Sequence, residues 1–173
     1  TTTGSIVALS DGPIAVVVGN AKNKDGITTD NAGTNSIILD NAGPTIGANY
    51  KIRDYVANTL VDGPITGQTP HVTNSLGRIH NETPSGVEVF QYSDVTDNGS
   101  GIPTTNAYSL SGTHSALFSV DDNGIVSTAK KIVWNDGVVA SNESTLTFNI
   151  VVTDNKGNTT DSAVILSIHD TTD

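Results

Sequence analysis

The chain of 173 residues contains no cysteine and no methionine, and its aromatic residues are one Trp, four Tyr and three Phe. Without cysteine no disulfide can form, so any link that staples loops together must be of another kind, and bound metal ions are the usual substitute. Because aromatic residues are scarce, Val, Ile and Leu must fill most of the core. The length suffices for one sizeable domain or two small ones.

Basic residues are scarce as well, since eight Lys and Arg stand against 18 Asp and Glu, for a formal net charge of −10. This sign is wrong for a phosphate backbone or an anionic membrane surface, so we expect no nucleic-acid partner. The longest apolar runs, such as residues 14–18 and 163–166, are too short to span a bilayer, and we expect no membrane insertion. We expect the sequence to be a mature fragment of a larger protein.

The residues that are abundant favour strands and turns. β-Branched side chains lose freedom in helices, whereas Asn, Asp and Gly suit tight turns. In residues 146–152 every second residue is apolar, and residues 163–168 alternate in the same way, which predicts a hairpin of two half-buried strands. Its predicted core-facing residues are Leu146, Phe148, Ile150, Val152, Val164, Leu166 and Ile168.

Shorter strand candidates precede this hairpin. They are residues 86–94, 107–110, 116–120 and 124–134, with Asp121–Gly124 (DDNG) as a turn. In the first of them Val87, Val89 and Gln91 alternate along one face. Six or seven short strands at this spacing predict an all-β fold, an antiparallel Greek-key sandwich with extra N-terminal strands and loops.

The N-terminal part shows the same pattern of strands and turns on a smaller scale. Residues 10–44 contain a strand, a loop rich in Gly, Asn and Asp, and a second strand at 36–40. So few strands make no sandwich alone, so they join the main domain, complete a partner, or belong to a truncated neighbour. Residues 65–77 are typical of a long loop. We therefore divide the chain into an N-terminal segment, residues 1–79, packed on or completing a main sandwich, residues 80–173.

One stretch combines basic and aromatic side chains, namely Tyr50, Lys51, Arg53 and Tyr55. Against an acidic background such a patch can bind a peptide carboxylate or stack on a sugar; the alternative is an edge strand with solvated Lys and Arg. Motifs for enzymes are missing: no G-x-S-x-G, no cysteine nucleophile and no H-E-x-x-H occurs. We expect a protein that is not an enzyme.

From residue 79 onward, short sequence segments follow one another in an order that can be compared with known repeats. The segments NETPSGVEV, YSDVTDNGSG, NAYSL, LFSVDDNGIVST, IVWND, FNIVVTDNKGN and ILSIHDTTD follow one another at suitable separations. In this order they resemble the cadherin repeat, over about one repeat. The resemblance implies a cadherin-like sandwich with Ca²⁺ as its cofactor, bound by acidic residues at both ends.

The resemblance also implies which residues hold calcium. At the C-terminal end these are Glu82, Asp136, Asp170 and Asp173, and at the opposite end they are Asp94, Asp97 and Asp154. Ca²⁺ takes six to eight hard oxygens, which carboxylates, amides and turn carbonyls supply. The sequence departs from the family where Asp136 stands in NDG and where Asp94 and Asp97 are one residue further apart. Weaker candidates are Asp25, Asp30 and Asp40, and the alternative for all these aspartates is ordinary turn chemistry.

The segment that begins at Leu9 (LSDGPIAVVVGNAKNKDG) and the later NSIILDNAGPTI resemble the last strands and linker of bacterial Ig-like repeats in giant RTX-type adhesins. This implies an extracellular, calcium-dependent adhesion module on a bacterial cell surface, with a role in biofilms. Its expected partners are a cell-surface protein, through a C-terminal peptide, or a glycan, together with adjacent adhesin domains. The alternatives are a calcium-rigidified spacer repeat without a ligand and a filament subunit that assembles by strand donation.

Overall fold

The computed structural model describes residues 12–17, 34–65, 74–134 and 144–170. Within these ranges the chain forms β-strands and one short 3₁₀ turn, η1 (Ser115–Leu117), and no α-helix. The strands are β1 (Gly12–Val17), β2 (Thr34–Leu39), β3 (Thr45–Ile46), β4 (Tyr50–Asp54), β5 (Thr59–Asp62), β6 (Gly77–His80), β7 (Glu88–Tyr92), β8 (Val95–Thr96), β9 (Tyr108–Ser111), β10 (Phe118–Val120), β11 (Ile125–Thr128), β12 (Thr145–Thr153) and β13 (Thr159–His169).

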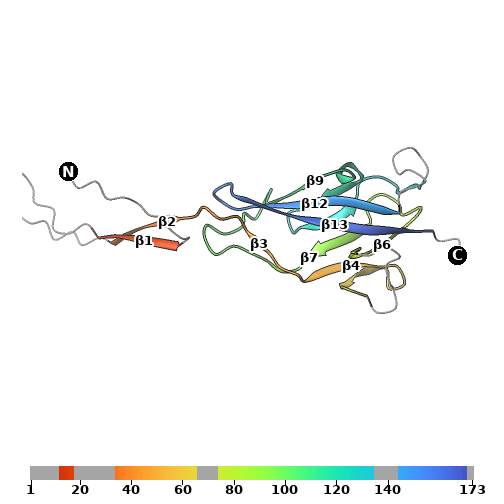
Figure 1. Ribbon diagram of the computed structural model, residues 1–173, viewed down its shortest axis with the longest axis horizontal. Coiled ribbons are helices and arrows are strands. Elements are labelled where there is room, and N and C mark those ends of the chain that lie inside the picture. Colours follow the sequence, from red (N-terminus) through yellow and green to blue (C-terminus); the bar gives the residue numbers. More distant parts are fainter. Residues whose placement is uncertain (1–11, 18–33, 66–73, 135–143, 171–173) are drawn as a thin grey trace, which may run out of the picture.

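Two sheets face each other and form a sandwich (Figure 1). One has the strand order β10-β11-β7-β4-β5 and the other the order β6-β13-β12-β9, while β3 and β8 form a small additional pair. Neighbouring strands are antiparallel except for β6 and β13, which run parallel from the pair Gly77–Leu166 to the pair His80–His169. The prediction of an all-β sandwich is thus confirmed. The described residues contain no helix long and apolar enough to cross a membrane.

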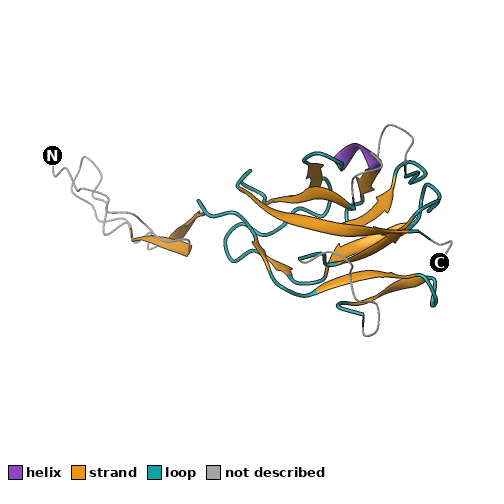
Figure 2. Ribbon diagram, turned by 45° about the vertical axis from the view of Figure 1, so that its right-hand side comes forward, coloured by secondary structure: helices purple, strands orange, loops and turns teal. Residues whose placement is uncertain are grey.

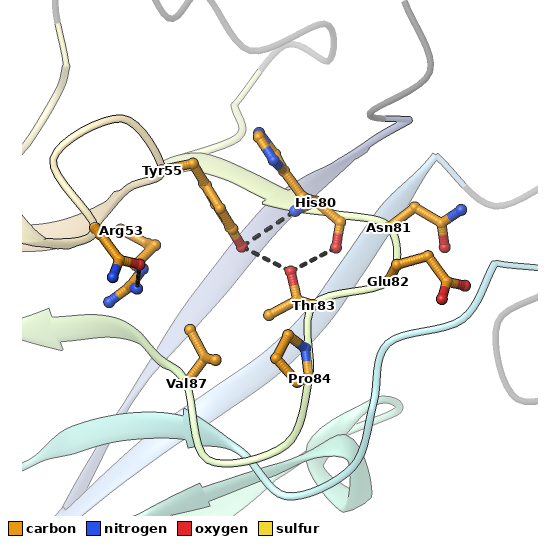
Figure 3. Close-up of a pocket in the computed structure, with 9 residues that line it drawn as sticks. Arg53, Tyr55, His80, Asn81, Glu82, Thr83, Pro84 and Val87 are labelled. Atoms are coloured by element: carbon orange, nitrogen blue, oxygen red, sulfur yellow. Dashed lines mark hydrogen bonds between the residues drawn. The ribbon is translucent and has the colours of Figure 1, made fainter.

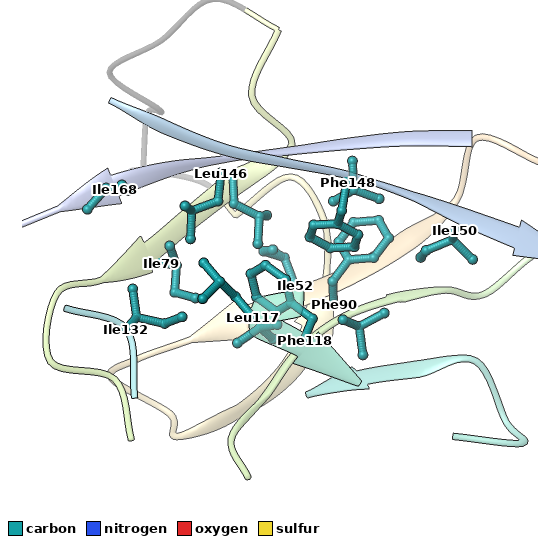
Figure 4. Packing of buried hydrophobic residues seen from close by; sticks show 14 of the residues in the cluster. Ile52, Ile79, Phe90, Leu117, Phe118, Ile132, Leu146, Phe148, Ile150 and Ile168 are labelled. Carbon is teal, nitrogen blue, oxygen red and sulfur yellow. The ribbon is translucent and has the colours of Figure 1, made fainter. Parts of the chain in front are cut away.

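The core lies between the two sheets (Figure 4). On β12 every second residue is buried, because side chains of a strand point alternately to opposite faces. Rings from the two sheets meet there: the centroids of Phe118 and Phe148 are 4.5 Å apart. All seven core-facing residues predicted for β12 and β13 are buried. Burial of each such side chain contributes about 1.5–3 kcal/mol to folding.

A β-bulge interrupts the regular alternation in β7. Val126 of β11 pairs with Phe90, whereas the next residue, Ser127, pairs with Glu88, so Val89 is an extra residue on β7. As a result Val89 and Phe90 are both fully buried. The sequence predicted a simple alternation through Val89, and the bulge brings a second apolar side chain of this strand into the core.

Part of the N-terminal segment belongs to the sandwich. Strands β4 and β5 extend the five-stranded sheet, and β6 lies at the edge of the four-stranded sheet. The β1–β2 hairpin, by contrast, forms a sheet of its own and lies apart from the sandwich in both views (Figures 1 and 2). Most of the predicted long loop, residues 66–73, lies outside the described residues.

Candidate metal centre and a polar pocket

Three aspartates meet at the end of the sandwich where the chain turns from β12 into β13. Asp40, Asp97 and Asp154 are each the first residue after a strand, namely β2, β8 and β12. Carboxylate oxygens of all three lie within 4.8 Å of one another. Asp154 is buried, with 3% of its surface exposed, and the other two are half-buried. We call these three residues the aspartate cluster.

Asp154 is held by the turn that follows it. Its Oδ1 accepts hydrogen bonds from the backbone N–H groups of Lys156, at 2.7 Å, and Asn158, at 2.8 Å. Its Oδ2 accepts one from the side-chain amide of Asn158 at 2.7 Å. Burial on its own raises the pKa of Asp154, but the hydrogen bonds from Asn158 and Lys156 outweigh it, and the pKa lies below its usual value of 3.8. Asp154 is therefore ionised at neutral pH.

Asp97 organises the loop of residues 97–101. Its Oδ2 accepts hydrogen bonds from the backbone N–H groups of Gly99, at 3.2 Å, and Gly101, at 2.6 Å. This loop is joined to the turn after β12, because the Asn155 side chain donates to the carbonyl oxygen of Ser100 at 2.8 Å. Two carboxylates of the cluster are thus positioned by loops that hydrogen-bond to each other.

Asp40 attaches the segment after β2 to the same loops. Its Oδ2 accepts a hydrogen bond from the backbone N–H of Ser100 at 2.6 Å, and its carbonyl oxygen accepts one from the Asn158 side chain at 3.3 Å. The carboxylate packs so closely on Gly99 that a Cβ atom at that position would lie 2.4 Å from Cγ of Asp40. Only glycine fits here without displacing Asp40.

The cluster gathers oxygen atoms of the kind that bind divalent cations. Asp40 Oδ1 and Ser100 Oγ are buried and have no hydrogen-bond partner, which costs about 1–3 kcal/mol for each such group. Three carboxylates this close also repel one another. A cation relieves both penalties, and Ca²⁺ prefers hard oxygen ligands of these kinds. Asp40, Asp97 and Asp154 therefore fit a bound Ca²⁺.

The structure brings together two of the three aspartates predicted for this end and adds Asp40, which the sequence marked only as a weaker candidate. Asp94 lies outside the cluster. It is exposed, its backbone oxygen accepts a hydrogen bond from the N–H of Gly47 at 2.6 Å, and its side chain packs against Gly47. A Cβ atom on Gly47 would lie 2.2 Å from Asp94 Oδ2.

The residues predicted for the C-terminal calcium site are only partly described. Glu82 and Asp170 follow the ends of the neighbouring parallel strands β6 and β13. The Glu82 carboxylate forms an ion pair with Lys131. Asp136 and Asp173 lie outside the described residues. Apart from the aspartate cluster, the described ranges hold no other group of three acidic or histidine side chains close enough to share a metal ion.

A pocket of about 240 Å³ lies at the end of the sandwich where β6 and β13 end, and we call it the polar pocket (Figure 3). It is lined by Arg53, Tyr55, Asn58, His80, Asn81, Glu82, Thr83, Pro84 and Val87. Of the four predicted ligand-binding residues, Arg53 and Tyr55 line it. Tyr50 stacks on Phe90, with ring centroids 5.5 Å apart, and donates a hydrogen bond to the carbonyl oxygen of Leu76 at 3.0 Å. Lys51 does not line the polar pocket.

A stacked pair of rings forms one wall of the polar pocket. The centroids of Tyr55 and His80 are 3.7 Å apart and their planes differ by 8°. The Tyr55 hydroxyl accepts a hydrogen bond from the His80 backbone N–H at 3.1 Å and lies 3.1 Å from Thr83 Oγ1. Burial raises the pKa of Tyr55, and burial together with nearby Arg78 and His169 lowers the pKa of His80. Both rings are therefore uncharged at neutral pH.

Sequence reasoning missed several residues of both sites. Asp40 was not missed but marked as a weaker candidate, and its local signal is the stretch DNAGP, which directly follows a strand. Asn158 lies in the turn of the predicted hairpin and Ser100 lies in the segment YSDVTDNGSG, but hydroxyl and amide side chains are too common in such segments to single out. His80 had no distinguishing neighbour in the sequence, because its partner Tyr55 lies 25 positions earlier.

The chain was also compared with known proteins. No protein-family model matches it, and no curated protein is found as a relative. The aspartate cluster and the polar pocket are therefore the features from which a function is inferred.

Proposed function

We propose that this protein is a calcium-stabilised adhesion module of a large bacterial cell-surface adhesin, and not an enzyme. The observation that carries the proposal is the aspartate cluster with its buried, unpartnered oxygens on Asp40 and Ser100. The sequence resemblances to cadherin repeats and to Ig-like repeats of RTX-type adhesins support the extracellular setting. Extracellular calcium modules bind with dissociation constants of about 10⁻⁴ to 10⁻³ M, so such a site fills outside cells.

The mechanism follows from where the three ligands come from. Asp97 and Asp154 belong to loops of the sandwich, whereas Asp40 belongs to the segment that leads from the β1–β2 hairpin. Calcium supplies a positive charge that turns the mutual repulsion of the carboxylates into attraction. The residues around it then hold the three segments in one arrangement. The cluster therefore acts as a clamp between the hairpin segment and the sandwich.

The test is thermal unfolding with calcium titrated against EDTA. At calcium concentrations ten to a hundred times the dissociation constant, binding only to the folded state adds about 1.4–2.7 kcal/mol of stability. We expect the Asp97→Asn variant to lose this gain, because one charged ligand is removed at unchanged size. Asp161→Asn is the matched control, since Asp161 lies on β13 and accepts a hydrogen bond from Asn149, away from the cluster. Equal melting temperatures with calcium and EDTA would contradict the proposal.

The polar pocket favours a ligand-binding module over a spacer repeat that has no ligand. We propose that its partner is a peptide or a glycan on a neighbouring cell, because the pocket offers a cation and a stacked aromatic wall. The filament alternative predicts calcium-dependent polymers. A single monomer peak on a sizing column with calcium present would remove it.

A further inference from the structure

The buried polar atoms without partners divide the molecule into two ends. Besides the two oxygens near the aspartate cluster, the described residues contain three such atoms, and all are nitrogens: Arg53 Nε, Arg78 Nε and His80 Nε2. They belong to β4 and β6. Because β6 runs parallel to β13, its last residue lies at the end of the sandwich opposite the turn after β12. At one end the buried atoms without partners are oxygens, and at the other end they are nitrogens.

Charge points to the same conclusion for the polar pocket. The chain has only eight Lys and Arg, yet one of them lines this pocket and two more lie close to its lining residues. Arg53 lines it, Arg78 is close enough to affect the pKa of Tyr55 and His80, and Lys131 neutralises Glu82 at the rim. Basic side chains are thus concentrated near this pocket in a molecule of net charge −10, which favours an anionic ligand.

Some hydrogen-bond donors of the residues that line the polar pocket have no acceptor within the described part of the chain. Asn58 Oδ1 accepts from Arg53 Nη2, and Asn81 Oδ1 accepts from the backbone N–H of Trp134 at 3.0 Å. The hydroxyl groups of Tyr55 and Thr83 are used by each other and by the backbone of His80. In the described part of the chain Arg53 donates only the hydrogen bond from Nη2 to Asn58, so its guanidinium has further N–H groups to donate. The NH₂ groups of Asn58 and Asn81 likewise donate to no acceptor in that part. A ligand here must accept hydrogen bonds.

We propose that the polar pocket binds a carboxylate that carries a small apolar group, with Arg53 as its anchor. A planar guanidinium matches a carboxylate with two parallel hydrogen bonds. Pro84, Val87 and the Tyr55 ring supply apolar walls for the attached group (Figure 3). A volume of about 240 Å³ is smaller than sites for drug-sized ligands, so it encloses a group about the size of one amino acid.

The inference rests on the ligand-binding part of the proposed function and is independent of calcium. The probe is N-acetylleucine, and its matched control is N-acetylleucinamide, which has the same shape without the charge. We expect the acid to bind, by calorimetry and by NMR shifts at Tyr55 and His80, and the amide to bind at least tenfold more weakly. Because the titration is run in calcium and in EDTA, loss of calcium stabilisation and loss of carboxylate binding are seen separately.

The variant Arg53→Gln tests the anchor. We expect it to weaken binding of N-acetylleucine at least tenfold. Lys51→Gln removes the same charge two positions away on β4 at a residue that does not line the polar pocket, so it should leave the affinity unchanged. Equal binding of acid and amide by the wild-type protein would overturn the proposal even if Arg53→Gln failed to fold. The proposal would also be overturned if N-acetylglucosamine bound and none of the carboxylic acids did.

A carboxylate of this kind comes either from a free acid or from the last residue of a peptide. The peptide Ac-Ala-Ala-Leu with a free C-terminus distinguishes these sources. Binding at least as tight as that of N-acetylleucine supports a carboxylate pocket that takes chain ends, and exclusion of the peptide while the free acid binds supports one that takes small acids. Failure of both ligands to bind overturns the proposal.

Discussion

One key side chain is charged at the first site and another is uncharged at the second, namely Asp154 and His80. Asp154 is buried yet ionised, because neighbouring N–H groups hydrogen-bond to its carboxylate. His80 is neutral, because burial and the nearby Arg78 and His169 disfavour a further positive charge. Each residue suits the partner proposed for its end, since calcium needs a charged carboxylate and an aromatic wall against Arg53 needs an uncharged ring.

The titration of His80 predicts how stability changes with pH. Its pKa in the folded protein lies below the usual 6.5, so the unfolded chain binds the proton more readily. The stabilisation is complete above pH 6.5 and is lost as the pH falls toward the folded-state pKa. We expect urea midpoints to fall between about pH 7 and pH 5, and the His80→Phe variant, which keeps the stacked ring, to show a flatter dependence. Identical slopes for both proteins would refute this account.

Asp154 is a carboxylate whose pKa is lowered by folding, so its ionised form stabilises the folded protein. The stability that it contributes is fully present above its usual value of 3.8 and is lost as the pH falls through its lower folded-state value. We expect acid to destabilise the wild-type protein below about pH 4 more steeply than the Asp154→Asn variant. Unfolding by urea at pH 2.5 to 5 measures this difference, and Asp161→Asn again serves as control. A variant as steep as the wild-type protein would argue against it.

Among the strands, those with the strictest pattern were predictable and those shaped by their neighbours were not. β12 and β13 pair over their whole shared length, so the alternation of their apolar residues is preserved in the structure. The bulge in β7 depends on how β11 pairs with it, which no local signal in residues 86–94 reveals. Strand β6 is short, and only its pairing with β13, about 90 positions later, makes it a strand.

The place of β6 in the sandwich depends on a glycine. A Cβ atom on Gly77 would lie 2.4 Å from Cγ1 of Ile52 in the facing sheet, so any side chain there overpacks the core. We expect Gly77→Val to destabilise the protein by about 1–3 kcal/mol, measured by urea unfolding. Ser111→Val, on an exposed position of β9, is the matched control and should change stability by no more than about 0.5 kcal/mol. A cost at Gly77 no larger than at Ser111 would contradict the proposed packing.

At the scale of the whole molecule, the aspartate cluster and the polar pocket lie at opposite ends of the sandwich. Acceptors without partners lie at the end with the aspartate cluster, and nitrogens without partners lie at the end with the polar pocket. The sequence predicted two of the three cluster residues, because aspartates in turns after strands are visible locally. Of the pocket residues it predicted Arg53 and Tyr55 as ligand-binding and Glu82 as a calcium ligand, whereas the others from residues 80–87 are brought in by pairing that no local pattern encodes.

This separation predicts that the two ligands act independently. Sites this far apart that share no residues usually add their effects within about 0.5 kcal/mol. We expect the stability gained with calcium and N-acetylleucine together to equal the sum of the gains with each alone. Hydrogen exchange should slow at the amides of Ser100, Gly101 and Asn158 with calcium, and at those of His80 and Asn81 with the acid. Strong coupling between the two gains would show that the ends communicate.

The position of β13 has a mechanical consequence. This strand runs from the end where Asp40 accepts hydrogen bonds from Ser100 and Asn158 to the end at His169, and it lies between β12 and the parallel strand β6. A tension applied between those two points loads the strand lengthwise, so that the hydrogen bonds to both neighbours are sheared together instead of being peeled apart one by one. Resistance to such a pull is set by the rate of forced unfolding and not by equilibrium stability. A pull along β13 is therefore opposed by both sets of hydrogen bonds at once.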